Sequence, residues 1–260
     1  MKKNYLLLLS TLFLLLNSIN AQITTNTPWI WVKGTNTLNS PGVYGIKGVA
    51  SSLNNPGARD AGVTWNDNKG NLWLFGGYGY DVTGTGSFLN DLWKYDIGSN
   101  QWTWMSGDNI INQTGVYGIQ GVPSAANKPG ARSGSCGWKD NNGNLWLFGG
   151  LVIVPGGYEV LNDLWKYDIK NNQWTWMKGS QLGAASVYGT QGVPDNNNVP
   201  GSRGVSVSWT DANGKFWLFG GGVISFNFTD NGFNDLWKYD PATNQWAWMK
   251  GDPVTINPPG

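Results

Sequence analysis

The hydrophobic and polar positions of this chain form short apolar segments that alternate with turns rich in Gly, Asn and Asp. The segments come in groups of four. In the first group they surround Trp65 and then read LWLFGG from Leu72, NDLWKYD from Asn90 and NQWTWM from Asn100. Four short apolar runs separated by turn residues predict a four-stranded antiparallel sheet.

The group occurs three times, and NDLWKYD returns at a spacing of 72 residues. Each copy also carries PG(A/S)R, with a Trp six residues after the Arg. A long period with four strands per unit is typical of a β-propeller, in which each unit is one blade. We therefore predict an all-β chain with almost no helix, and complete blades at about 56–105, 129–177 and 200–249.

The chain has 17 Trp, and all of them fall at repeat positions. Each copy contains five, and Trp29 and Trp31 match the fourth strand of an earlier, partial copy at 28–33. Aromatic residues that recur in every unit are expected to pack one sheet on the next, because large aromatics dominate such interfaces. Stacking of a single Trp on a carbohydrate is the alternative.

These features resemble the kelch-repeat family, in particular exported kelch proteins of the bacterial type. The likeness covers essentially everything after Gln22, and departs from the family in the long connections that contain GVYGIKGV, GVYGIQGV or SVYGTQGV. It implies a propeller scaffold and says little about function, since kelch propellers include oxidases, a sialic acid epimerase and plain interaction modules. The structural residues that carry it are Gly76, Gly77, Trp93, Gly149, Gly150, Trp165, Gly220, Gly221 and Trp237.

The first residues resemble an export signal. Lys2 and Lys3 precede an apolar run, and a small residue, Ala21, suits cleavage before Gln22. We expect residues 1–21 to be a signal peptide, residues 22–260 to form the propeller region, and the product to be secreted or displayed on the cell surface. A membrane anchor is the alternative, but the run is shorter than the roughly 20 residues a spanning helix needs.

Three complete blades and a partial one form an incomplete propeller, because closed propellers have four to eight blades. The tail after Trp248 parallels the segment after Trp31, as if a further copy had begun. We expect the chain to be the N-terminal part of a longer product. Assembly with copies of itself and an open wedge are the alternatives.

The chain has no His, which excludes His-based acid–base catalysis and His metal ligands within it. The likeness to galactose oxidase therefore extends to its scaffold and not to its copper site. The acidic turns at 66–71 and 139–144 suggest calcium, but they fall short of the several oxygen ligands that it requires, and tight Asx and Gly hairpins explain them and the turn at 210–215 without an ion. We expect no metal or cofactor. The single Cys, Cys136, takes the place of a small apolar core residue.

The favoured function is a binding module for a protein or glycan, acting through the long loops between the second and third strands and between blades. Loops on a rigid scaffold commonly carry function. The alternative is a carbohydrate-active enzyme, similar to an oxidase or epimerase, whose catalytic residues lie in further blades. The candidate loop residues are Tyr78, Tyr80, Asp81, Tyr158, Glu159, Phe226, Phe228 and Asp230.

Three arginines, Arg59, Arg132 and Arg203, open the first strand of each blade and are candidates to bind an anionic group. The alternative is that they tie the connection to backbone carbonyls or to a neighbouring Asp. A net charge near −1 after loss of Lys2 and Lys3 (15 basic against 16 acidic residues) supports no nucleic acid partner. We also expect no membrane partner after cleavage, and self-association if the propeller is incomplete.

Overall fold

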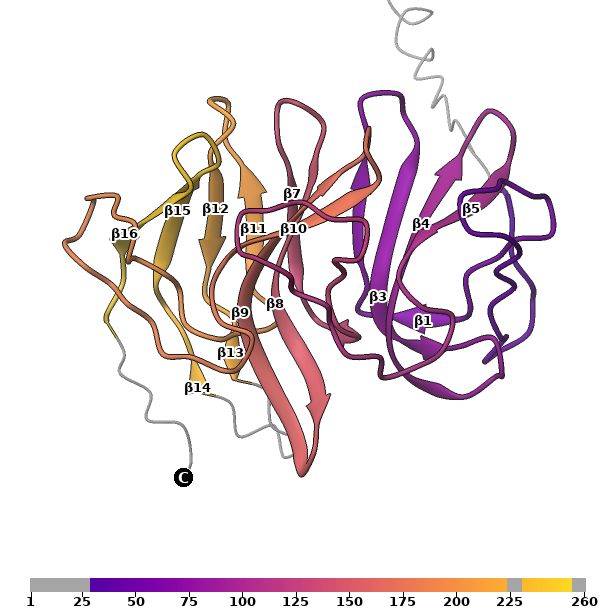
Figure 1. Cartoon of the computed structure of the whole chain (residues 1–260), viewed down its shortest axis with the longest axis horizontal. Coiled ribbons are helices and arrows are strands. Elements are labelled where there is room, and N and C mark those ends of the chain that lie inside the picture. The colour runs from indigo at the N-terminus through magenta and orange to yellow at the C-terminus, as the bar shows by residue number, and fades with distance from the viewer. Residues whose placement is uncertain (1–28, 224–230, 254–260) are drawn as a thin grey trace, which may run out of the picture. The chain divides into compact units, whose positions relative to one another are not determined.

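The computed structural model describes residues 29–223 and 231–253 (Figure 1). Strands and turns account for the regular structure in these ranges and no helix occurs there, which confirms the all-β prediction. The same ranges accordingly contain no helix long and apolar enough to cross a membrane. The chain divides into a unit of Met1–Lys33 and a unit of Gly34–Gly260, and the sheets all lie in the second.

Each repeat copy forms one antiparallel sheet in which consecutive long strands pair. A two-residue strand precedes the predicted first strand in copies one and two and pairs with the same neighbour. The strands of the first sheet are β1 (Arg59–Asp60), β2 (Val63–Asn66), β3 (Leu72–Tyr80), β4 (Gly86–Asp96) and β5 (Gln101–Ser106). Those of the second are β6 (Arg132–Ser133), β7 (Cys136–Lys139), β8 (Leu145–Val154), β9 (Gly157–Asp168) and β10 (Gln173–Lys178).

The third sheet keeps the four predicted strands in the same order. They are β11 (Val207–Thr210), β12 (Phe216–Phe219), β15 (Leu236–Asp240) and β16 (Gln245–Lys250). A separate two-stranded sheet joins β13 (Gly222–Val223) to β14 (Asn231–Gly232). The fourth strand expected at 28–33 is not a strand over its described residues, because no described strand pairs with it.

Two apolar clusters lie between sheets and not within one. The first joins Val63, Trp65 and Phe75 of the first sheet to residues of the second, including Leu147 and Trp174. The second repeats this arrangement between the second and third sheets. Seven Trp side chains are almost completely buried, as expected for aromatics that pack sheet on sheet: Trp73, Trp93, Trp146, Trp165, Trp174, Trp237 and Trp246.

The paired glycines bend the second strand of the first and second sheets, and in the third sheet they follow directly after β12. Gly76 and Gly77 have φ values of 60° and 97°, and the β3–β4 register shifts at this point. A Cβ at Gly77 would lie 2.3 Å from the carbonyl oxygen of Asp60. Glycine is therefore required both for the left-handed backbone and for the close approach of the neighbouring strand.

The long connections cover the outer edge of each sheet. Residues 43–55 run beside β5, where Ser51 pairs with Trp102 and the Asn54 side-chain amide donates to the carbonyls of Val49 and Trp102. Asn127 and Asn198 make the same contacts in the other copies. The departure from the usual kelch unit thus protects backbone groups that an open edge strand would expose.

Cys136 lies in the second cluster, as its repeat position predicted. Burial raises the pKa of its thiol to about 12. Because the thiolate is the reactive form, this thiol is far less ionised at pH 8 than a thiol in an unfolded chain. We expect a thiol-specific chromogenic reagent at pH 8 to modify the native protein far more slowly than the protein in denaturant. Equal rates would contradict this burial.

Candidate binding surface

The three candidate arginines are paired inside the fold. Arg132 binds Asp163 with both ends of its guanidinium, at 2.6 Å and 2.8 Å. Its remaining contacts are to the backbone carbonyls of Gly130 and Gly149. The Arg132 side chain is 1% exposed and that of Asp163 is 0% exposed. This guanidinium therefore faces no solvent-filled opening.

The same pairing recurs between Arg59 and Asp91 and between Arg203 and Asp235. In each copy the Arg also donates to the carbonyl of the first glycine of the pair, Gly76 or Gly220. The hypothesis that these arginines bind an anion is therefore wrong, and the structural alternative describes them. A bidentate buried pair leaves no geometry for a ligand carboxylate.

The Asp partner is the second residue of the NDLWKYD motif. Asp163 also accepts hydrogen bonds from the Tyr117 hydroxyl at 2.7 Å and from the Trp165 indole at 2.7 Å. Tyr117 belongs to the GVYG part of the connection, so one carboxylate joins the connection, the first strand and the third strand. Burial and the nearby Asp163 charge raise the pKa of Tyr117 well above its usual value.

The acidic hairpins are closed by their own hydrogen bonds. Asp67 Oδ1 accepts hydrogen bonds from the backbone amides of Lys69 and Asn71. Its Oδ2 accepts from the side-chain amide of Asn71 and from the Trp73 indole. These bonds lower the pKa of Asp67 against the effect of its burial. Asp140 repeats the arrangement. The Asx hairpin therefore explains these turns without an ion.

Two of the loop residues also have structural roles. Asp81 is buried and accepts hydrogen bonds from the backbone amides of Thr83, Thr85 and Ile111. Glu159 accepts from the backbone amide of Gly183 at 2.7 Å. Both carboxylates thus hold a loop or connection in place through these bonds.

The loop tyrosines gather around a buried phenylalanine that the sequence did not single out. Phe88 on β4 lies opposite Tyr78 on β3, with the ring centroids 6.0 Å apart. On its other side Phe88 contacts Tyr158 of β9, also at 6.0 Å. Tyr78 is 47% exposed, Tyr158 is 44% exposed and Phe88 is 5% exposed. The row crosses from the first sheet to the second.

Tyr80 extends this row along β3. It lies two residues from Tyr78 and so on the same face of the strand. A Cβ at Gly86 would lie 3.2 Å from the Tyr80 ring, which places that ring over Gly86. We call Tyr78, Tyr80, Phe88 and Tyr158 the aromatic patch. The other loop candidates, Phe226, Phe228 and Asp230, lie outside the described residues.

The patch lies toward the long-loop ends of the strands. Figure 1 shows the β8–β9 hairpin pointing away from the β7–β8 hairpin, and Tyr158 is the second residue of β9 after that turn. The β8–β9 turn, which consists of Pro155 and Gly156, thus lies at the strand ends opposite to the β7–β8 hairpin, as alternating strand direction requires. Phe88 could have been suspected from sequence only after the β3–β4 register was known.

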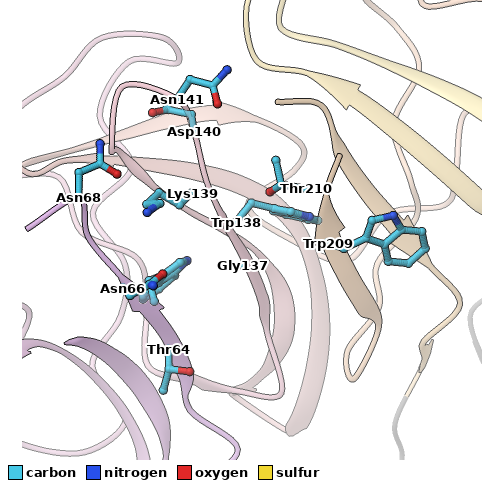
Figure 2. A pocket seen from close by; sticks show the side chains of 11 residues that line it. Thr64, Asn66, Asn68, Gly137, Trp138, Lys139, Asp140, Asn141, Trp209 and Thr210 are labelled. Atoms are coloured by element: carbon cyan, nitrogen blue, oxygen red, sulfur yellow. The ribbon is translucent and has the colours of Figure 1, made fainter. Parts of the chain in front are cut away.

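A cavity of about 550 Å³ lies along the first strands β2, β7 and β11, toward the hairpin ends (Figure 2). No predicted ligand residue lines it. Its Asp140 is already engaged in the β7–β8 hairpin, and one wall is Trp209 at the exposed side of the third sheet. The lining residues are Thr64, Trp65, Asn66, Asn68, Gly137, Trp138, Lys139, Asp140, Asn141, Trp209 and Thr210.

Comparison with known proteins agrees with the repeat structure. No family model matches the chain. Kelch domain-containing protein 10 of Bos taurus and that of Homo sapiens are each 24% identical over 225 residues, or 70% of this chain and 46% of the relative. The chain has an all-β fold of repeated four-stranded sheets and is similar in sequence to these kelch proteins. It spans about half the length of the curated relatives it matches.

The solved structure of YjhT matches this chain with a TM-score of 0.45 and 17% identity. The match covers 81% of this chain and 53% of YjhT.

Proposed function

We propose that this kelch-repeat protein is an exported binding module that recognises a protein partner through its aromatic patch. The observation that carries the proposal is the row of Tyr78, Phe88 and Tyr158, which spans two sheets with its two tyrosines about half exposed. Tyrosine is enriched among the residues that dominate protein–protein binding energy.

The patch is built on rigid elements. Asn112 holds the backbone of Phe88. The Phe88 backbone amide donates to the Asn112 side-chain oxygen, and the Phe88 carbonyl accepts from the Asn112 backbone amide. Tyr78 and Tyr158 stand on paired strands and not on loop tips. Rings held in this way lose little conformational entropy on binding.

The proposal of export is based on the sequence of residues 1–21, in which Lys2 and Lys3 precede an apolar run. These residues lie outside the described ranges. The relatives named as kelch domain-containing proteins agree with an interaction role, and nothing in their names identifies a partner. A glycan remains the alternative ligand. It would stack on the same tyrosines and is distinguished by the experiment below.

The test is selection of peptide ligands from a displayed random library on the immobilised protein. Tyr78→Ala and Tyr158→Ala should each weaken binding of the selected peptides by about 30-fold or more, since central aromatic residues contribute at least about 2 kcal/mol. Dissociation constants from titration calorimetry would measure the effect, and thermal melts would establish that the variants remain folded.

The matched control is Ile97→Ala. Ile97 is an exposed apolar residue in the β4–β5 turn, at the opposite strand ends from the patch. It should leave affinity unchanged. Equal affinity of wild type and both tyrosine variants would refute the patch, and ligands obtained only from a glycan array would refute the protein partner.

A further inference from the structure

A carboxylate lies at one end of the aromatic patch. Asp60 on β1 is directly opposite Tyr78 on β3, and Tyr78 is in turn opposite Phe88 on β4. Side chains opposite each other in an antiparallel pair point to the same face, with Cβ atoms about 4.5 to 5.5 Å apart. Asp60, Tyr78 and Phe88 therefore form one row across three strands, and Tyr158 of the second sheet continues it.

This row lies on the side of the first sheet that faces the second sheet. Phe88 contacts Tyr158 of β9 from that side. The row is therefore built by two sheets that pack on one another within the chain.

The Asp60 carboxylate is exposed, and within the described part of the chain it accepts no hydrogen bond and forms no ion pair. Arg59, the residue before it, is already bound to Asp91 through both ends of its guanidinium. Asp60 thus differs from Asp67 and Asp91, which hold a hairpin and a connection in place. It is an unused acceptor beside an exposed ring.

The pairing of Asp60 with Tyr78 is specific to the first sheet. The residue pairs at the same register in the other sheets are Ser133 with Leu151 and Gly204 with Gly222. The scaffold therefore forms with three different pairs at this position, whereas the Arg–Asp pairs that stabilise it recur in every copy. The fold does not require Asp60 or Tyr78, and their exposure supports a role in binding.

A carboxylate beside an exposed aromatic ring has the chemistry that binds a guanidinium. The planar arginine side chain stacks on aromatic faces, and its fork of N–H donors matches a carboxylate. Tyr78 is 47% exposed and so offers its ring to a partner. Arginine is also enriched among the residues that dominate protein–protein binding energy.

We propose that the Tyr78 ring and the Asp60 carboxylate together bind an arginine side chain of the protein partner. The guanidinium stacks on Tyr78 and donates to Asp60. Tyr158, at the other end of the row, contacts a neighbouring residue of the partner. This site is part of the aromatic patch, so the proposal rests on the binding function proposed above.

Two parallel selections from one displayed random peptide library test this site, one on the wild type and one on Asp60→Asn. We expect arginine to be enriched several-fold in the peptides selected on the wild type and not in those selected on Asp60→Asn. The variant should melt at the same temperature as the wild type, because the Asp60 side chain is exposed and bonds to nothing in the described chain.

Asp96→Asn is the matched control. It removes the same charge at the opposite end of β4, where an Asn side-chain oxygen can still accept from the backbone amide of Ser99. Peptides selected on this control should be as rich in arginine as those selected on the wild type.

Titration calorimetry of a selected peptide gives a second measurement. Replacing its arginine by citrulline, which has nearly the same shape without the charge, should weaken binding to the wild type by about tenfold. The same replacement should weaken binding to Asp60→Asn by less, because the partner of the charge is already absent. Added salt should likewise weaken binding to the wild type more than to Asp60→Asn.

Equal enrichment of arginine on the wild type and on Asp60→Asn would overturn the proposal, as would an equal effect of citrulline on the two proteins. If Tyr78→Ala and Tyr158→Ala still weaken peptide binding in that case, the aromatic patch stands and only the arginine site falls. If both tyrosine variants bind as the wild type does, the proposed function fails and the arginine site fails with it.

Discussion

Asp163→Ala should lower the free energy of unfolding by about 3 to 5 kcal/mol, because removing one partner of a buried ion pair leaves the other charge uncompensated. The Arg132 guanidinium is almost completely buried and donates its two shortest hydrogen bonds to Asp163. Tyr117 and Trp165 would lose their acceptor as well. The loss is a large share of the 5 to 15 kcal/mol that stabilises a typical domain.

Denaturant unfolding followed by tryptophan fluorescence would measure this loss. Asp168→Ala is the matched control on the same strand, since Asp168 caps the β9–β10 turn by accepting from the backbone amides of Lys170 and Asn171 and from the Asn171 side-chain amide. Its loss should be about 1 kcal/mol. Similar losses for the two variants would show that the Arg132–Asp163 pair does not hold the connection to the sheet.

Sequence periodicity was sufficient for the strands. NDLWKYD lies within β4 and β9, and its last five residues form β15. LWLFGG opens β3 and β8, and FWLF forms β12. The hairpins followed from turn chemistry, because Asp67 and Asp140 each close a tight turn through their own side chains. These features depend on residues close together in the chain, where spacing alone determines the contact.

The roles of the arginines could not be predicted from motif spacing, because each arginine binds a residue that lies far away in the sequence. Arg132 and its partner Asp163 are 31 residues apart. The sequence showed that both recur in every copy, which favours a structural role, but it could not show which Asp of NDLWKYD turns inward. In the structure Asp163 is buried beneath the connection, and Asp168 caps a turn at the surface.

The aromatic patch was predicted only in part. Tyr78, Tyr80 and Tyr158 were recognised as loop variations, whereas Phe88 was not, because its contact with Tyr78 depends on the β3–β4 register. The contact between Phe88 and Tyr158 crosses two sheets and depends on how they pack. Neither relation leaves a periodic signal in the sequence.

Trp93→Ala should lower the free energy of unfolding by about 3 to 5 kcal/mol, the usual cost of removing a buried aromatic side chain from a packed core. Trp93 is completely buried and packs against Tyr44 of the connection and Trp102 of β5. Its indole also donates to Asp91, the partner of Arg59, at 2.7 Å. Urea unfolding monitored by circular dichroism would measure the change.

Trp93→Phe separates the two contributions, because a phenyl ring keeps part of the packing and cannot donate to Asp91. Leaving one buried acceptor short of a donor costs about 1 to 3 kcal/mol, so this variant should lose less than Trp93→Ala. Trp29→Ala, at a fully exposed repeat tryptophan, should change stability by no more than about 0.5 kcal/mol. If Phe and Ala at position 93 were equally destabilising, the lost hydrogen bond and not the packing would explain why every copy carries this tryptophan.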